Sequence, residues 1–209
     1  MEPLRIIEAI LFAANRPLSE EEIASLLKAG GDTSGILFDE ASLAVDNIRR
    51  WLDEYGRNLE GSGMQLVAVA GGYRLATRED YAPWISAMFD EAKPPRLSGP
   101  ALETLAVIAY RQPISRAEIE AVRGVAVGGV LETLVDRGVI RVAGRADVPG
   151  RPLIYETTPF FLEHFGLRDL NDLPNVEELK RVKLPDPPEP EAPQQPELLH
   201  ESAGPTQEN

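Results

Sequence analysis

The sequence predicts a mainly helical α+β fold in which one plan, three helices followed by a β-hairpin, is used twice. Two heptapeptides mark the plan: Pro17–Ile23 reads PLSEEEI, and Pro113–Ile119 reads PISRAEI, 96 positions later. Each follows an apolar stripe at helical spacing and precedes a further helix and two short strands. This order is typical of the winged-helix plan, so we expect two tandem winged-helix domains with short antiparallel β-hairpin wings.

The first copy opens with a helix whose apolar stripe starts at Leu4 and which Pro17 ends. Ser19 starts a second helix, because Ser19 and Glu22 have the spacing of a capping box. Glycines at 30, 31 and 35 predict a loop over 29–38.

A longer helix is expected next, over about 39–55, with apolar residues close to a heptad seam. Two strands, 64–70 and 73–77, flank Gly71-Gly72, a pair of residues that favours a tight hairpin turn. Thr77 then caps one more helix, which carries several aromatic and methionine side chains.

The second copy repeats this order. A helix is expected over 101–110, and Ser115 with Glu118 forms the next capping box. The remaining expected elements are, in order, a helix at 127–137, a strand at 139–142, a wing at 144–150, a strand at 153–157 and a helix at 159–165.

Composition changes at two places along the chain. Pro94 and Pro95 favour a stiff extended connector, and the segment 183–209 holds seven of the eighteen prolines with six acidic residues against one lysine. The expected organisation is therefore an N-terminal winged-helix domain (1–91), a linker (92–97), a C-terminal winged-helix domain (98–182) and a disordered acidic tail (183–209).

The bulk composition restricts the classes of protein to consider. The chain has 209 residues, a formal charge of −13 and no cysteine, which excludes disulfides and cysteine-bound zinc. Its N-terminus lacks the basic leader and cleavage site of a signal peptide, and no stretch approaches a membrane span, so we expect a cytoplasmic protein with no membrane partner.

Residue sets that carry catalysis are not found in the sequence. Of the two histidines, His200 falls in the tail and His164 beside Phe165 at the end of an apolar helix. No Ser/His/acid set, metal-ligand cluster or phosphate-binding loop is present. We therefore expect a protein that is not an enzyme and that carries no cofactor and no metal.

DNA binding is the competing interpretation, as a tandem winged-helix transcription regulator. A winged helix that reads DNA places its third helix in the major groove, but both third helices here are acidic or nearly uncharged. Arg141, Arg145 and Arg151 cluster at the second wing and would allow weak contact with the DNA backbone. Arg151 could instead order the hairpin by pairing with Asp147 or with a backbone carbonyl.

The first copy has more large apolar residues than a domain of its size needs. As a set they favour self-association of the N-terminal domain, although each one alone fits an ordinary core. The residues predicted to form this dimer interface are Ile6, Ile10, Phe12, Trp84, Met88 and Phe89.

Several motifs of the second copy resemble one family, the segregation and condensation protein B (ScpB) family. The matching stretches are E-T-L-A-x-I-A-Y-x-Q-P-I at Glu103–Ile114, I-x-x-x-R-G-V at Ile119–Val125 and G-R-x-x-x-P-G-R-P-x-x-Y at Gly144–Tyr155. The first copy is similar in outline, with E-A-x-L-F-A-x-x-x-P-L-S at Glu8–Ser19 and G-x-x-L-x-T at Gly72–Thr77.

The resemblance implies a homodimeric, non-catalytic subunit of the bacterial SMC–kleisin complex. Such a subunit binds the kleisin ScpA directly, reaches SMC through ScpA, and supports chromosome condensation and partition during cell division at the nucleoid. ATP hydrolysis would belong to SMC.

The matched surface of the second copy predicts where ScpA binds. The predicted patch consists of Tyr110, Arg111, Gln112, Arg151, Pro152 and Tyr155. A structural role is the alternative for three of these residues: Tyr155 could be core, and Arg111 and Gln112 could cap the preceding helix.

Overall fold

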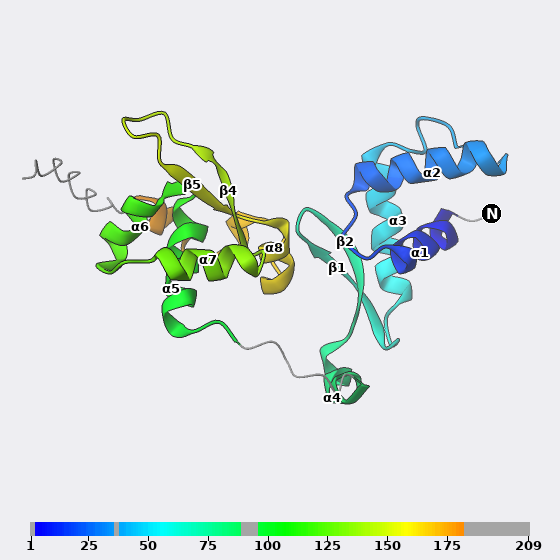
Figure 1. Ribbon diagram of the computed structural model, residues 1–209. Helices are drawn as coiled ribbons and strands as arrows, with labels where there is room; N and C mark the ends of the chain where they lie inside the picture. Colours follow the sequence, from blue (N-terminus) through cyan, green and yellow to red (C-terminus); the bar gives the residue numbers. More distant parts are fainter. Residues whose placement is uncertain (1–2, 36–37, 89–95, 182–209) are drawn as a thin grey trace, which may run out of the picture.

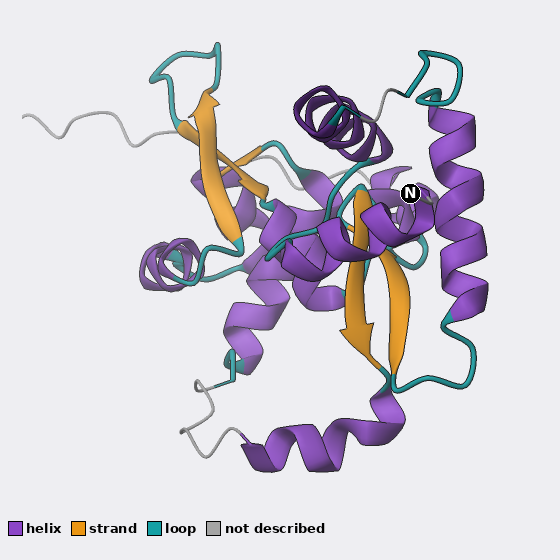
Figure 2. Cartoon of the chain, turned by 90° about the vertical axis from the view of Figure 1, so that its right-hand side faces the viewer, coloured by secondary structure: helices purple, strands orange, loops and turns teal. Residues whose placement is uncertain are grey.

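A computed structural model of the chain describes residues 3–35, 38–88 and 96–181. It is a mixed helix and strand fold with two small antiparallel sheets. The described residues form two hydrophobic clusters, one built from residues 4–75 and the other from residues 97–173. Figure 1 shows α1, α2 and α3 on one side of the first hairpin and α4 apart from them, and Figure 2 shows the two hairpins separated from each other.

The first part follows the expected order of elements. Its elements are α1 (Pro3–Ala13), α2 (Glu20–Ser34), α3 (Val45–Asn58), β1 (Met64–Val69), β2 (Gly72–Thr77), a 3₁₀ turn η1 (Glu79–Tyr81) and α4 (Ala82–Met88). The three long helices and the hairpin enclose one core, and the fully buried side chains in it are Ile7, Ile23, Leu27, Ile48 and Leu52.

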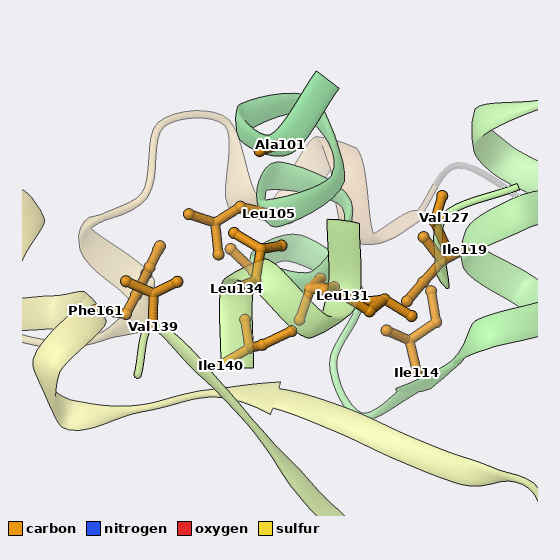
Figure 3. Close-up of a cluster of buried hydrophobic side chains, with 12 residues drawn as sticks. Ala101, Leu105, Ile114, Ile119, Val127, Leu131, Leu134, Val139, Ile140 and Phe161 are labelled. Atoms are coloured by element: carbon orange, nitrogen blue, oxygen red, sulfur yellow. The ribbon is translucent and has the colours of Figure 1, made fainter. Parts of the chain in front are cut away.

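The second part repeats that order. Its elements are α5 (Gly99–Arg111), β3 (Ile114–Ser115), α6 (Arg116–Arg123), α7 (Gly128–Asp136), β4 (Ile140–Arg145), β5 (Leu153–Thr157), α8 (Pro159–Phe165), a 3₁₀ turn η2 (Leu170–Asp172) and α9 (Val176–Arg181). Figure 3 shows its core, where side chains from α5, α6 and α7 meet Ile140 and Phe161.

Both capping boxes are confirmed. The Ser19 hydroxyl accepts the Glu22 N–H, and the Glu22 carboxylate accepts the Ser19 N–H at 3.0 Å. Ser115 and Glu118 repeat this reciprocal pair at the start of α6. Each box satisfies donors that a helix N-terminus otherwise leaves without partners.

At the start of each box the chain pairs with the hairpin that follows. In the second part, Ile114 and Ser115 form β3 and pair with Tyr155 and Ile154 of β5. In the first part, Leu18 makes the equivalent bridge to Tyr73 of β2, with mutual backbone hydrogen bonds of 3.0 and 2.8 Å. The heptapeptide repeat therefore encodes a strand residue as well as a helix start.

The first hairpin turns one residue earlier than expected. Val69 pairs with Gly72, so Ala70 and Gly71 form the turn, both with positive φ. Gly72 belongs to the strand because the Leu18 backbone crosses it: a Cβ at Gly72 would lie 2.6 Å from the Leu18 carbonyl carbon and oxygen. This glycine serves a close approach between backbones rather than a turn.

Two boundaries near the glycine-rich segment also differ from expectation. The loop prediction at 29–38 is wrong for its first half, because α2 runs on to Ser34 and ends at Gly35, which is left-handed at φ 75°. Gly31 continues the buried stripe of Ile23 and Leu27, so packing retains the helix there. The next helix starts at Val45 rather than near Asp39, whose carboxylate accepts the Ser42 N–H and holds a turn.

The second hairpin also differs from expectation. Strand β4 is longer than expected, since it continues through an irregularity between Val142 and Gly144 to Arg145. Most of the predicted linker and all of the predicted tail lie outside the described residues. The boundaries 1–91, 92–97, 98–182 and 183–209 stay predictions.

Candidate partner-binding surface

Three residues of the predicted ScpA patch, Tyr110, Arg111 and Gln112, lie at the end of α5. The Gln112 side chain forms hydrogen bonds that stabilise the fold. Its Oε1 accepts the Thr157 backbone N–H at 2.5 Å and the Thr157 hydroxyl at 3.0 Å, and its Nε2 donates to the Ala109 carbonyl at 3.4 Å. The half-buried amide therefore joins the last turn of α5 to the end of β5. The sequence left two roles open for Gln112, contact with ScpA and capping of the preceding helix. These hydrogen bonds fit the capping role.

Tyr110 lies next to a hollow. Its hydroxyl donates to the Pro174 carbonyl at 2.8 Å, which ties α5 to the segment before α9. Tyr110 and Pro174 border an apolar hollow of about 250 Å³. The other residues that line it are Leu102, Leu105, Ala106, Ala109, Phe161, Phe165, Leu167 and Leu173.

A second hollow of about 520 Å³ adjoins the first, because Leu102 and Phe165 line both. Phe160 also lines it, and all three of these side chains are about half exposed. Arg96 and Arg137 lie at its edge, and the residues that line it include no carboxylate. Together the two hollows form an apolar groove with a basic border, which we call the α5/α8 groove.

The α5/α8 groove was not identified from the sequence. Its signal was present, since the short helix α8 carries aromatic residues at 160, 161 and 165. Only Phe161 is buried in the core. Phe165 packs on Phe161 with ring centroids 4.8 Å apart, and His164 makes an edge contact with Phe165. His164 is therefore part of an aromatic group on the groove.

The other half of the predicted patch lies on the second hairpin. Tyr155 packs against the core from β5 and lines a separate hollow of about 220 Å³ with Arg116 and Glu132. Arg151 is exposed at the tip with φ 41°, and the Pro152 carbonyl accepts the Ala146 N–H at 2.9 Å.

The structure therefore does not gather the six patch residues into one hollow. Tyr110 lines the α5/α8 groove, whereas Tyr155 lines the hollow beside α6 and α7. Arg111 follows Tyr110 at the end of α5 and is half-buried. ScpA contact at these positions stays a prediction.

The three arginines of the proposed DNA contact are engaged to different degrees. Arg141 forms an ion pair with Glu156 on the neighbouring strand, with 2.8 Å between Nε and Oε1. Arg145 donates to the Arg151 carbonyl at 3.0 Å, so the arginine that bonds a backbone carbonyl of this hairpin is Arg145, whereas the sequence suggested Arg151 for that role. A cation paired with a carboxylate offers less attraction to phosphate.

The residues of the predicted dimer interface fall into two groups. Phe12, Trp84 and Met88 are 77%, 68% and 74% exposed, which is unusual for side chains of this size. Ile6 and Ile10 are partly buried against the first core. Phe89 lies outside the described residues. The interface stays a prediction.

The described residues contain neither a cluster of metal ligands nor a helix that could span a membrane. Within 3–35, 38–88 and 96–181, His, Asp and Glu side chains nowhere gather in threes that could hold a metal ion. None of the helices in those ranges has the length and apolar content that a membrane span requires.

Comparison with known proteins assigns the chain to a family. Residues 5–176 match the family model described as segregation and condensation complex subunit ScpB. A segregation and condensation protein B from Moorella thermoacetica is 45% identical over 168 residues, which span 79% of this chain and 78% of that protein. One from Syntrophotalea carbinolica is 44% identical over 167 residues, which span 80% and 78%.

Solved structures are also similar. The crystal structure of ScpB from Mycobacterium tuberculosis is 34% identical, covers 79% of this chain and 96% of that chain, and superposes with a TM-score of 0.35. A structure described as a dimer of an ScpB N-terminal domain complexed with an ScpA peptide is 26% identical, covers 44% and 92%, and has a TM-score of 0.33. On the match over residues 5–176 and the identities above 40%, this chain belongs to the family of segregation and condensation complex subunit ScpB.

Proposed function

We propose that this chain is a non-catalytic subunit of a bacterial SMC–ScpA–ScpB complex, where it binds the kleisin ScpA and reaches SMC through it. The proposal rests on one observation: the ScpB family model matches residues 5–176, which include both copies of the repeated plan. In this role the chain supports chromosome condensation and partition, acts as a homodimer in the cytoplasm and associates with the nucleoid.

Each copy is, in this proposal, a winged-helix domain. Support comes from the order of elements, α1–α2–α3–β1–β2 in the first part and α5–α6–α7–β4–β5 in the second. The pairing of β3 with β5 adds a third, short strand to the second hairpin, and the bridge from Leu18 to Tyr73 adds a single paired residue to the first. Both features are expected of a helix-turn-helix core with a hairpin wing.

Homodimerisation is assigned to the first part. The support is the exposure of Phe12, Trp84 and Met88, since large apolar side chains on a surface favour protein association. The test is the mass in solution by light scattering, first alone and then with a segment from the middle of ScpA. We expect a dimer of 22.9 kDa chains that takes up one ScpA segment. A monomer that ignores the segment would refute the proposal.

The ScpA contact can be tested at two residues of the predicted patch, the exposed Arg151 and the half-buried Tyr110. Arg151→Ala removes an exposed side chain, and Tyr110→Phe removes only a hydroxyl. Both changes leave the core intact, unlike changes at Gln112 or Tyr155. We expect each to weaken ScpA binding by about tenfold, measured by calorimetry on the full chain. Arg141→Ala, on the same hairpin but outside the patch, is the matched control and retains normal affinity.

The alternative, a DNA-binding transcription regulator, is less well supported. A regulator of this kind would have a basic third helix in each domain. The third helices here, α3 and α7, have no excess of basic over acidic residues. DNA contact, if present, would be weak and would involve Arg141, Arg145 and Arg151. A monomer that binds duplex DNA and loses that binding on Arg145→Ala would favour the alternative.

A further inference from the structure

The first hairpin contacts the second part of the molecule through its turn. The Ala70 N–H donates to the Leu167 carbonyl at 2.9 Å, and the Gly71 N–H donates to the Arg168 carbonyl at 2.8 Å. Figure 1 shows the β1–β2 hairpin lying between the helices of the first part and α8. Two consecutive N–H groups thus meet two consecutive carbonyls across nearly a hundred residues of chain.

The turn geometry explains why these donors are available. Val69 pairs directly with Gly72, so the turn residues Ala70 and Gly71 are outside the strand ladder. Both have positive φ, at 50° and 71°. A turn in which both central residues are left-handed matches strand twist and leaves their N–H groups at the tip. The tip therefore presents two N–H donors, those of Ala70 and Gly71, that have no acceptor within the hairpin.

The receiving loop is ordered by contacts of its own. Gly166 ends α8 in the left-handed region at φ 68°. Arg168 then donates three hydrogen bonds to Asp172, from its backbone N–H at 2.8 Å and Nε at 3.0 Å to Oδ2, and from Nη2 at 2.7 Å to Oδ1. A loop ordered by its own ion pair presents the Leu167 and Arg168 carbonyls in a fixed direction, which lowers the entropic cost of docking.

One ion pair also joins the two parts. Arg74 on β2 contacts Glu163 on α8, with 3.0 Å between Nη1 and Oε2. The pair is partly buried, and the Glu163 side chain is the less exposed partner at 20%. This position extends the contact from the tip along one face of the hairpin.

We propose that the β1–β2 hairpin is a docking element for the second part of the same chain, and that the loop 166–172 with Glu163 is its receiving surface. The wing of the first part then serves an intramolecular contact rather than contact with nucleic acid. The proposal is independent of ScpA binding and concerns the free chain.

The docked contact adjoins the α5/α8 groove. Among the described residues it includes two backbone hydrogen bonds and one partly exposed ion pair. Leu167 takes part in docking through its carbonyl and also lines the α5/α8 groove. A molecule that occupies that end of the groove therefore meets the receiving loop directly.

The test reverses the charge on each side of the ion pair. Arg74→Glu and Glu163→Arg each place like charges together, whereas the double variant restores an opposite pair. Amide hydrogen exchange at Ala70 and Gly71 in the full chain reports docking. We expect exchange about tenfold faster in each single variant and a return towards the original rate in the double variant. Arg141→Glu, which breaks a pair inside the second hairpin, is the control and leaves these two amides unchanged.

A distance measurement distinguishes docking from local protection. The chain contains no cysteine, so spin labels attached through Lys28→Cys and Ala117→Cys mark one part each. The labelled chain is diluted with unlabelled protein so that only distances within one chain are measured. We expect one narrow distance distribution, which broadens with Arg74→Glu. A broad distribution in the starting protein, or equal Ala70 and Gly71 exchange with and without Arg74→Glu, would overturn the proposal.

Discussion

Gly72 shows how a single residue can have a different role from the one its sequence context indicates. The pair Gly71-Gly72 predicts a turn, but only Gly71 lies in it. Gly72 is an extended strand residue against which the Leu18 backbone packs. No local rule identifies it, because Leu18 is more than fifty residues away along the chain.

Gly72→Ala is expected to destabilise the first part by about 3 kcal/mol, because its Cβ would overlap backbone that cannot rotate away. Gly99→Ala is the matched control: nothing lies within 4 Å of a Cβ there, so stability is unchanged or slightly higher. Denaturant unfolding of both variants measures the difference. A Gly72→Ala protein as stable as the control would mean that Leu18 does not cross the strand.

Gln112→Ala is expected to cost about 1–3 kcal/mol, since the half-buried Thr157 N–H and hydroxyl lose their acceptor. Gln65→Ala serves as the control, because the Gln65 amide makes one exposed hydrogen bond to a threonine carbonyl at 3.4 Å. That change should stay within about 0.5 kcal/mol. Thermal unfolding measures both, and equal effects would remove the structural role assigned to Gln112.

At the scale of elements, the molecule depends on one device used twice: a strand residue, a capping serine and a helix. The Ser115 hydroxyl lies 2.6 Å from the Glu118 carboxylate and is buried, whereas the Ser19 box is less enclosed. The two copies of the box thus differ in their surroundings but share their geometry.

Ser19→Ala and Ser115→Ala are each expected to lower stability by about 0.5–2 kcal/mol, the usual cost of losing an N-cap. Ser115→Ala should be the more costly, because the groups that it leaves behind are less hydrated. Ser25→Ala, in the interior of α2, is neutral or stabilising because alanine has the higher helix propensity. A Ser25→Ala loss equal to the other two would show that capping is not the cause.

The receiving loop 166–172 contributes the clearest pH dependence. The hydrogen bond from Arg168 is the main cause that lowers the pKa of Asp172 to about 2. An unfolded aspartate titrates near 3.9, so this ion pair stabilises the loop above that pH and stops doing so as pH falls towards 2. NMR titration of the carboxyl should give the lowered pKa, and Arg168→Ala should return it towards 3.9. An unchanged value in that variant would exclude Arg168 as the cause.

At the scale of the whole molecule, charge is unevenly distributed. Residues 3–88 hold 8 basic and 13 acidic side chains, a formal charge of −5, whereas residues 96–181 hold 11 and 12, a charge of −1. The second part therefore repels an acidic partner less than the first part does, but neither part is basic overall. This distribution favours protein partners over phosphate.

The full chain is accordingly expected to pass through a heparin column at about 0.15 M salt without retention. Glu156→Gln, which removes the carboxylate partner of Arg141, should increase retention slightly, and Arg145→Ala should not. Strong retention of the unchanged protein that falls with Arg145→Ala would support the DNA-binding alternative.

The sequence by itself determined the repeated order of elements, the capping boxes and the family, because these depend on local spacing and on short motifs. Tertiary structure alone decided the strand role of Gly72, the continuation of α2 through Gly31, the α5/α8 groove and the docking of the first hairpin. Each of these depends on groups distant in sequence, such as Leu18 with Gly72 or Ala70 with Leu167. A local pattern specifies which elements form, but their contacts depend on which backbones and side chains the fold brings together.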